Sequence, residues 1–251
     1  MKSLKSKPPW SESESRSKTW SDDEAAGDSL QTAVLLHPAV LPAACSLQPE
    51  AFFAFMIAAK PGKLVVISGP SGVGKSTVVR EVLQQLGPTI RLSVSATTRP
   101  PRPGERDGVD YYFLTDAEFR RRREEGEFLE CIEVFGRGHW YGTLWSEVRS
   151  SLSQGKWVIL EIDVDGAGEV LRQFPEAVTI FIRPDSVEEL ERRLRSRGTE
   201  SEDAVQRRLA VARHELQLSS QYSHQVVNDT VDQAVDQICD ILRSRGLEPE
   251  A

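Results

Sequence analysis

Residues 69–76 carry the glycine-rich motif that most constrains how this chain folds. They read Gly-Pro-Ser-Gly-Val-Gly-Lys-Ser and fit the pattern G-x-x-x-x-G-K-[ST] at every fixed position. An apolar β-branched run precedes the motif at 64–67, and a helical pattern follows it at 77–83. Glycines let backbone N–H groups turn towards an anion, and the helix adds the positive end of its dipole. The motif therefore predicts a nucleoside triphosphate site, with Lys75 near the β- and γ-phosphates and Ser76 ligating Mg²⁺.

The composition is that of an ordinary globular chain of 251 residues, with 39% hydrophobic and 27% charged residues. Its net charge of −7 argues against general affinity for nucleic acid or an anionic membrane, so we expect neither partner. Cys45, Cys131 and Cys239 lack metal-site spacing and favour reduced thiols in a cytosol. The most apolar stretch, 33–59, is interrupted by prolines and polar residues. With no secretory or organelle leader pattern, these features predict a cytoplasmic location without a membrane span.

The composition changes sharply near Lys60, where we expect the folded part to begin. Residues 1–30 are rich in serine and acidic side chains, which is typical of disorder. We therefore predict a disordered or poorly ordered extension over 1–60. The chain has two methionines, Met1 and Met56. We hypothesise that translation starts at Met56, and the alternative is a genuine disordered arm.

Strand and helix patterns alternate from residue 63 onward, which predicts an α/β fold with a parallel sheet flanked by helices. Between 95 and 142, short strand-like segments, turns and aromatics predict an antiparallel insertion. Asp116 and Ser186 have the residue types of helix N-caps. The predicted strands are 64–68, 90–95, 109–114, 128–134, 157–162, 178–182 and 225–228. The predicted helices are 75–86, 116–124, 144–153, 166–173, 186–196, 201–220 and 231–244.

Two arginines, Arg99 and Arg102, lie three residues apart in a proline-rich loop. Guanidinium groups bind phosphate through paired hydrogen bonds, and prolines reduce the entropy that the loop loses on binding. The loop therefore favours a second phosphate site, and the alternative is a solvated surface loop. Glu130 lies on an alternating strand, where a carboxylate can accept two N–H groups from the edge of guanine. Taken alone, this position also fits an exposed carboxylate.

Acidic and basic residues later in the chain are further candidates for the triphosphate site. Glu161 and Asp163 end an apolar strand, a position from which acids orient Mg²⁺ or its water in triphosphate sites. The alternative is a pair of solvated carboxylates. Arg193 and Arg197 share one helix face at i and i+4, and Arg208 follows in the next predicted helix. Such arginines can neutralise a phosphoryl group in transfer, although arginine-rich helices are commonly solvated faces.

Assembled, these residues resemble the guanylate kinase family over residues 63–242. The resemblance implies a kinase that uses ATP and Mg²⁺ to phosphorylate GMP, giving ADP and GDP in purine nucleotide metabolism, with dGMP as a second acceptor to test. It implies a P-loop NTPase parallel sheet flanked by helices, a small mixed or antiparallel GMP-binding subdomain, and a helical lid. The motifs that carry it are Ser95-x-Thr97-Thr98-Arg99-x-x-Arg102-x-Gly104-Glu105, Gly108-x-Asp110-Tyr111-x-Phe113, Tyr141-Gly142-Thr143 and Arg197-Gly198-Thr199-Glu200.

The resemblance also implies domain limits and site residues. The family domain is expected at 61–246, before a tail at 247–251. Its parts are a core (61–94, 144–185 and 216–246), a GMP-binding subdomain (95–143) and a lid (186–215). The implied catalytic residues are Lys75, Arg193, Arg197 and Arg208. The implied ATP-binding residues are Gly69, Pro70, Ser71, Gly72, Val73, Gly74, Lys75, Ser76, Thr77 and Asn228. The implied GMP-binding residues are Ser95, Arg99, Arg102, Glu105, Tyr111, Glu130, Tyr141, Thr143 and Asp163. Ser76 is the implied Mg²⁺ ligand, together with nucleotide phosphates and water.

Two departures from the family pattern bear on the metal. The family usually has Asp-Ile-Asp at the strand end, where this chain has Glu161-Ile162-Asp163, and one extra methylene can shift a contact to a metal-bound water. Gln is common where Asp165 stands.

A different class of reading is a binding module, because guanylate kinase-like domains of scaffolds bind phosphorylated partners. Those domains typically lose the glycines and lysine that this chain keeps. A third reading is a kinase of another phosphorylated acceptor.

Overall fold

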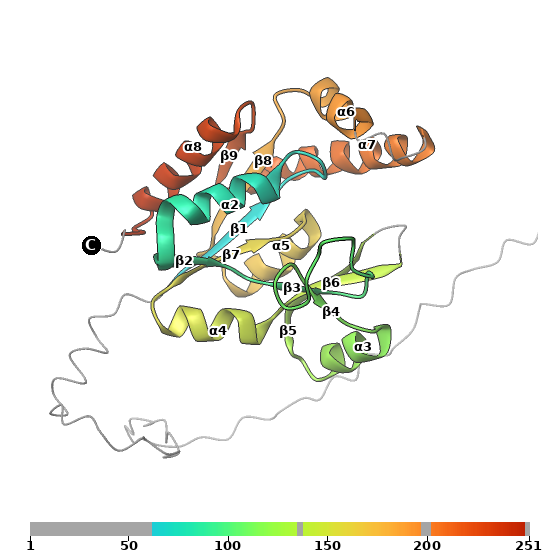
Figure 1. The fold of residues 1–251 in the computed structure, drawn as a ribbon. Coiled ribbons are helices and arrows are strands. Elements are labelled where there is room, and N and C mark those ends of the chain that lie inside the picture. The colour runs from blue at the N-terminus through green and yellow to red at the C-terminus, as the bar shows by residue number, and fades with distance from the viewer. Residues whose placement is uncertain (1–61, 135–137, 197–201, 249–251) are drawn as a thin grey trace, which may run out of the picture. The chain divides into compact units, whose positions relative to one another are not determined.

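Parallel strands form the central sheet of the described chain, in the order β2–β7–β1–β8–β9 (Figure 1). The structure, a computed structural model, describes residues 62–134, 138–196 and 202–248, so the predicted extension 1–60 lies outside it. Every strand pair in this sheet is parallel, and the five residues of β1 are all buried. The predicted α/β fold with a parallel sheet is therefore confirmed. The strands are β1 (Leu64–Ser68), β2 (Ile90–Leu92), β7 (Trp157–Glu161), β8 (Val178–Arg183) and β9 (His224–Val227).

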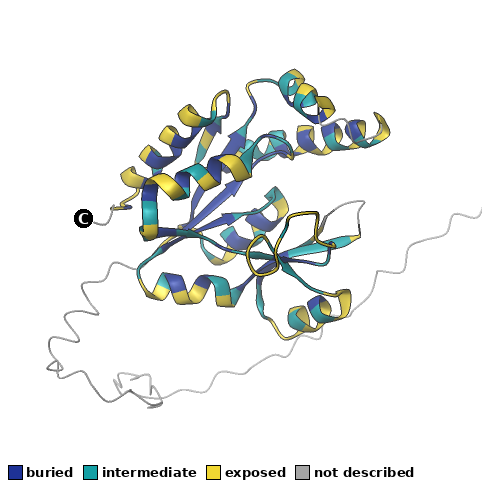
Figure 2. Ribbon diagram, viewed as in Figure 1, coloured by how far each residue is buried: buried dark blue, intermediate teal, exposed yellow. Residues whose placement is uncertain are grey.

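Helices cover both faces of this sheet, and their apolar residues form two cores with it (Figure 2). On one face, Val78 and Val82 of one helix pack with Ile238 of another over Ile67. On the other face, Val148 and Val170 pack with Phe181. Leu247, which falls in the predicted tail, is buried in the first core, so the ordered chain runs further than expected. The helices are α2 (Lys75–Leu86) and α8 (Val231–Ser244), then α4 (Trp145–Ser153) and α5 (Val164–Gln173).

A second, smaller sheet has the order β4–β3–β6–β5 within the described residues. Its β3–β4 pair is parallel, whereas its β3–β6 and β5–β6 pairs are antiparallel, so the sheet is mixed. Phe119 of the neighbouring helix packs with Ala96 and Leu144 in a separate small core. The elements are β3 (Ser95–Thr97), β4 (Tyr112–Phe113), β5 (Phe128–Val134), β6 (His139–Leu144) and α3 (Asp116–Glu124).

Several predicted boundaries in this region are wrong. The predicted strand 90–95 is divided between the two sheets, because the chain leaves β2 after Leu92 and enters β3 at Ser95. The predicted strand 109–114 shortens to Tyr112–Phe113, and β6 was not predicted at all. The N-cap of α3 is Thr115 and not Asp116, since the Thr115 side chain accepts a hydrogen bond from the backbone of Glu118.

A helical pair, α6 (Val187–Ser196) and α7 (Glu202–Gln217), occupies the region of the predicted lid. Ser186 caps α6 as expected, because its hydroxyl accepts the backbone N–H of Glu189 at 3.1 Å. Leu190 and Leu194 of α6 pack with Leu209 of α7 in a core of their own. Short 3₁₀ helices, η1 (Gly87–Thr89) and η2 (Leu218–Gln221), complete the elements. No helix among the described residues has the length and apolar character needed to cross a bilayer.

Candidate active site

The glycine-rich loop, residues 69–74, joins the end of β1 to the start of α2. Gly69 has a φ of 150°, and a Cβ at this position would lie 2.1 Å from the carbonyl oxygen of Ile182. Only glycine therefore fits where the loop passes β8. The loop ends at the N-terminus of α2, which is the geometry that favours a bound anion. The predicted strand–loop–helix arrangement is present.

Lys75 and Ser76 begin α2 and direct polar groups to the loop and to the neighbouring strand. The Lys75 Nζ donates to the carbonyl oxygen of Gly69 at 2.6 Å and to that of Pro70 at 3.3 Å, so the ammonium lies along the loop. The Ser76 hydroxyl donates to Oε1 of Glu161, at the end of β7, at 2.7 Å. A hydroxyl and a carboxylate thus meet beside the loop, and these are oxygen donors of the kind that Mg²⁺ prefers.

Two of the predicted arginines reach the same loop from the helical pair. Arg193 of α6 donates to the carbonyl oxygens of Val73 at 3.4 Å and Asn228 at 3.3 Å. Arg208 of α7 donates to the Ser71 hydroxyl at 2.8 Å. Arg197 lies outside the described residues. Two of the three predicted arginines therefore meet at the glycine-rich loop.

Asn228 and Glu189 hold the loop and its arginine in place. The buried Asn228 side chain donates to the carbonyl oxygen of Val73 at 2.7 Å, so it supports the loop backbone. Glu189 accepts a hydrogen bond from Nε of Arg193 at 2.8 Å. Glu189 was not predicted, although its place four residues before Arg193 on one helix face is the signal that could have found it.

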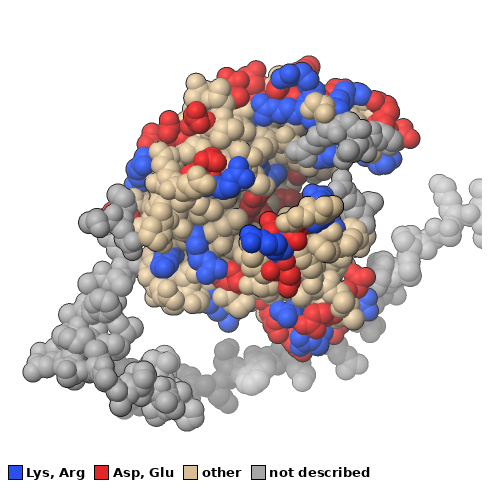
Figure 3. Space-filling model, viewed as in Figure 1, with Lys and Arg blue, Asp and Glu red and all other residues tan. Residues whose placement is uncertain are grey.

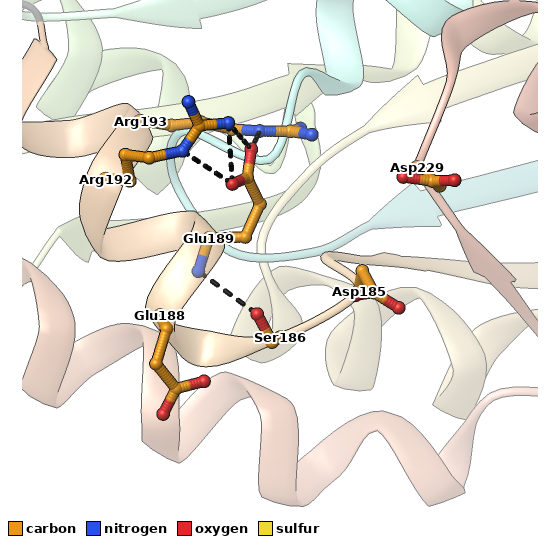
Figure 4. Close-up of a pocket in the computed structure, with 7 residues that line it drawn as sticks. All are labelled: Asp185, Ser186, Glu188, Glu189, Arg192, Arg193 and Asp229. Carbon is orange, nitrogen blue, oxygen red and sulfur yellow. Dashed lines mark hydrogen bonds and ion pairs between the residues drawn. The ribbon is translucent and has the colours of Figure 1, made fainter.

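A cavity of about 510 Å³ opens next to this arginine. Figure 4 shows Glu189 pointing to Arg192 and Arg193, with Asp229 across the opening from α6. Its volume is within the range of pockets that hold a nucleotide-sized ligand. Arg193 contacts both the cavity and Val73 of the glycine-rich loop, so the two spaces adjoin. The cavity is lined by Asp185, Ser186, Glu188, Glu189, Arg192, Arg193 and Asp229.

Arg99 is the centre of a second cluster, built on the smaller sheet. It is only 9% exposed, and its guanidinium pairs with both carboxylate oxygens of Glu105 at 2.9 Å. Its Nε donates to the Tyr141 hydroxyl at 3.2 Å, and its Cζ lies 5.4 Å from the ring centroid of Tyr111. The hydrogen bond from Arg99 holds the pKa of Glu105 below its usual range. Glu105 also accepts the backbone N–H of Arg102 at 2.7 Å, so it orders the whole loop.

Glu130 is buried at 4% exposure on β5, where a β-bulge changes the register. The bulge follows Phe128 and brings Glu130 opposite Thr143 of β6. The Thr143 hydroxyl donates to Oε1 of Glu130 at 2.7 Å, and Thr143 pairs in turn with Ser95 of β3. Burial raises the pKa of Glu130 to about 7, the Thr143 hydrogen bond lowers it, and the nearby Asp163 charge adds to the rise.

Asp163 joins this cluster from the larger sheet. It follows β7 and caps α5, because Oδ1 accepts the backbone N–H of Gly166 at 2.8 Å. Burial raises the pKa of Asp163 as well. A Cβ on Gly166 would lie 2.9 Å from Oε2 of Glu130, so the helix start and the Glu130 carboxylate are in close contact. Glu130 on the smaller sheet and Asp163, which follows a strand of the larger sheet, thus belong to one cluster. Figure 3 shows acidic and basic side chains gathered in the hollow between the loop region and the smaller sheet.

The fold and these clusters define an α/β nucleotide-binding protein with two adjoining polar sites. A comparison with family models gives the particular family: the Guanylate kinase model matches residues 61–245. The chain therefore belongs to the guanylate kinase family, which confirms the resemblance seen in the sequence.

Individual relatives agree with this assignment. A guanylate kinase of Rhodopirellula baltica is 56% identical over 185 residues, which cover 73% of this chain and 88% of the relative. One from Nostoc sp. is 48% identical over 177 residues, covering 70% and 87% of the two chains. Among solved structures, guanylate kinase from Anaplasma phagocytophilum aligns with a TM-score of 0.61 and 34% identity. That alignment covers 75% of this chain and 88% of the other.

Proposed function

We propose that this chain transfers the γ-phosphoryl group of ATP to GMP, giving ADP and GDP. The observation that carries the proposal is the pairing of two sites: a glycine-rich anion loop, and polar clusters on the smaller sheet with a buried arginine and a buried carboxylate. Family membership supports the same reaction. We also infer that the enzyme works in the cytoplasm, in the recycling of GMP.

The clusters around Arg99 and Glu130 have the groups that GMP requires. Ionised Glu130 can accept two N–H groups from the edge of guanine, while Ser95, Thr143 and Asp163 supply polar groups beside it. Arg99 supplies a buried cation for the phosphate of GMP, and we expect Arg102 and the hydroxyls of Tyr111 and Tyr141 to contact the same phosphate. Glu105 is best regarded as a positioning residue, because both of its oxygens bind Arg99.

The glycine-rich loop and the adjoining cavity suit ATP. The loop N–H groups, the Lys75 ammonium and Arg208 supply positive charge for the triphosphate. The cavity beside Arg193 is large enough for the adenosine part. Asn228 would then act on ATP through the loop that it supports. On this account Lys75 exchanges its carbonyl partners for phosphate oxygens when ATP binds.

The Ser76 hydroxyl and the Glu161 carboxylate are the residues that would hold Mg²⁺ with the nucleotide. They meet at 2.7 Å and are hard oxygen donors, so the residues present fit the ion. Bound Mg²⁺ would neutralise negative charge on the triphosphate. Glu161 contacts Ser76 directly. This contact supports a role for Glu161, although its side chain is one methylene longer than the aspartate usual in the family.

The reaction follows from the charges of the two substrates. An oxygen of the GMP phosphate attacks the γ-phosphorus in line, and because this oxygen is already anionic no general base is needed. The work of the protein is to hold two polyanions together, which the cations Lys75, Arg99, Arg193 and Arg208 make possible. We propose that residues 95–143 and 186–215 close over the substrates and exclude water.

A coupled assay of ADP formation tests this function. The full chain is given MgATP with GMP, dGMP, AMP, CMP, UMP or no acceptor. We expect turnover confined to GMP and dGMP, abolished in Lys75→Ala, with a raised KM for GMP in Arg102→Ala. Arg120→Ala, an exposed arginine on α3, is the matched control and should behave as the wild type. No turnover by folded protein that binds GMP would instead favour a non-catalytic binding module.

A further inference from the structure

Strand β5, which carries Glu130, lies at one edge of the smaller sheet. Among the described residues it pairs with β6 on one side, and it ends the strand order on the other. Backbone groups on the outer side of an edge strand need partners from outside the sheet. Helix α5, which packs against the larger sheet, supplies two such partners.

Two side chains of α5 bind the peptide groups on either side of Glu130. The Gln173 side chain donates from Nε2 to the carbonyl oxygen of Leu129 at 2.8 Å. The Glu169 side chain accepts the backbone N–H of Cys131 through Oε2 at 3.3 Å. Glu169 and Gln173 are four residues apart, so they share one face of the helix. The backbone of Glu130 is thus held at both of its peptide bonds.

The contact from Gln173 falls at the β-bulge. Leu129 is the extra residue of the bulge, between the paired positions Phe128 and Glu130. Because side chains alternate along a strand, a shift of one residue here would turn Glu130 away from the interior. By binding the Leu129 carbonyl oxygen, Gln173 stabilises the register that buries the carboxylate.

The same helix also contacts the carboxylate itself. A Cβ on Gly166, in the first turn of α5, would lie 2.9 Å from Oε2 of Glu130. Helix α5 therefore constrains both ends of this residue, the backbone through two side chains and the carboxylate through its own first turn. Covering the edge of the sheet would require only the backbone contacts.

We propose that Glu169 and Gln173 are positioning residues for guanine recognition, which fix the backbone of Glu130 so that its carboxylate meets the N1–H and the 2-amino group of the base. A carboxylate that is already in place loses less entropy when the base binds. This inference deepens the proposed function and rests on it only in taking guanine as the group that Glu130 contacts.

A comparison of GMP with IMP tests the proposal, because IMP lacks only the 2-amino group. Affinities of the full chain for GMP, IMP and ADP are measured by calorimetry at pH 8. At this pH Glu130, whose pKa burial raises to about 7, is mostly ionised. Glu169→Ala removes the acceptor, and Gln173→Leu removes the donor at similar size. We expect each to lower the ratio of GMP to IMP affinity roughly fivefold or more, with ADP affinity within about twofold of wild type.

Two further variants separate the hydrogen bonds from charge and from general effects. Glu169→Gln keeps an acceptor oxygen and should keep the ratio within about twofold of wild type. Glu176→Ala, an exposed glutamate just beyond the end of α5, is the matched control and should behave as the wild type.

The proposal is overturned if Glu169→Ala or Gln173→Leu keeps the wild-type ratio, or if Glu169→Gln loses as much as Glu169→Ala. It is also overturned if ADP affinity falls in parallel, since that result indicates a general loss of structure. Wild-type protein that does not prefer GMP to IMP would overturn it as well, whatever reaction the protein catalyses. Wild-type protein that has this preference but transfers no phosphoryl group would contradict the proposed function and leave this test intact.

Discussion

The hydroxyl of Thr143 donates a hydrogen bond to the carboxylate of Glu130 across two neighbouring strands, with 2.7 Å between Oγ1 and Oε1. This bond fixes one oxygen of a carboxylate that the β-bulge has turned into the interior. It opposes the burial that raises the pKa of Glu130 to about 7. A group expected to recognise guanine is thus poised to gain or lose a proton near neutral pH.

The affinity for GMP should therefore depend on pH. Only ionised Glu130 can accept both guanine N–H groups, and with a pKa of about 7 it is mostly protonated at pH 6. We expect GMP affinity to fall about tenfold from pH 8 to pH 6, measured by calorimetry. Glu130→Gln serves as the reference for protonation of the GMP phosphate itself. Parallel pH curves for the two proteins would show that Glu130 does not titrate in this range.

Removing the same charge should stabilise the fold at high pH while it impairs GMP binding. The pKa of Glu130 is about 7 in the folded protein, above the usual 4.5, so the unfolded chain ionises first. The free energy of unfolding therefore falls as pH rises from about 4.5 to about 7. Glu130→Gln lacks this loss and should be roughly 1–3 kcal/mol more stable than wild type at pH 8. Urea unfolding at about pH 4, below both pKa values, should show almost no difference, and a gap independent of pH would refute this explanation.

A methyl group at Gly166 should displace the Glu130 carboxylate. The added Cβ would lie 2.9 Å from Oε2 of Glu130, and the carboxylate end is the part that can move. We expect Gly166→Ala to weaken GMP binding tenfold or more. Gly168→Ala is the matched control on α5, because nothing lies within 4 Å of its added Cβ. That control should bind GMP normally and gain roughly 0.5–1 kcal/mol of stability, as expected for alanine in a helix. Equal GMP affinity in both variants would rule out the contact as a determinant.

Neutralising Glu161 should weaken the use of Mg²⁺. Glu161→Gln can still accept the Ser76 hydroxyl, but it loses the charge that favours a hard cation. We expect the Mg²⁺ concentration for half-maximal turnover to rise about threefold or more, with the KM for GMP unchanged. Glu176→Gln, at an exposed position, should keep the wild-type Mg²⁺ dependence. An unchanged Mg²⁺ dependence in Glu161→Gln would exclude this carboxylate from the metal site.

The sequence predicted the central sheet well because its strands are continuous apolar runs. It failed at places where tertiary contacts decide the structure. Nothing in the pattern of 90–95 shows that the chain changes sheets after Leu92, and Gly142 lowers the strand propensity of β6. Leu129 and Glu130 are both buried because a β-bulge interrupts their alternation, which a simple period of two cannot predict.

The candidate site was predictable where one motif carries the chemistry and less so where distant residues meet. The glycine-rich loop and the two arginines of the proline-rich loop could be found from spacing alone. The N-cap of α3 was predicted one residue too late, at Asp116, although a threonine three residues before Glu118 is the pattern that would have marked Thr115. The close approach of Gly166 to the Glu130 carboxylate was not predictable from spacing, because the two residues lie on different elements of the chain.

The fate of the γ-phosphoryl group tests the central claim most directly. The full chain is mixed with Mg²⁺, GMP and ATP labelled at the γ-phosphorus, and the products are separated after a single turnover. The account predicts that the label appears in the β-position of GDP, that free phosphate stays at background, and that Lys75→Ala forms neither product. Label that appears only in inorganic phosphate, or transfer that does not require GMP, would contradict it.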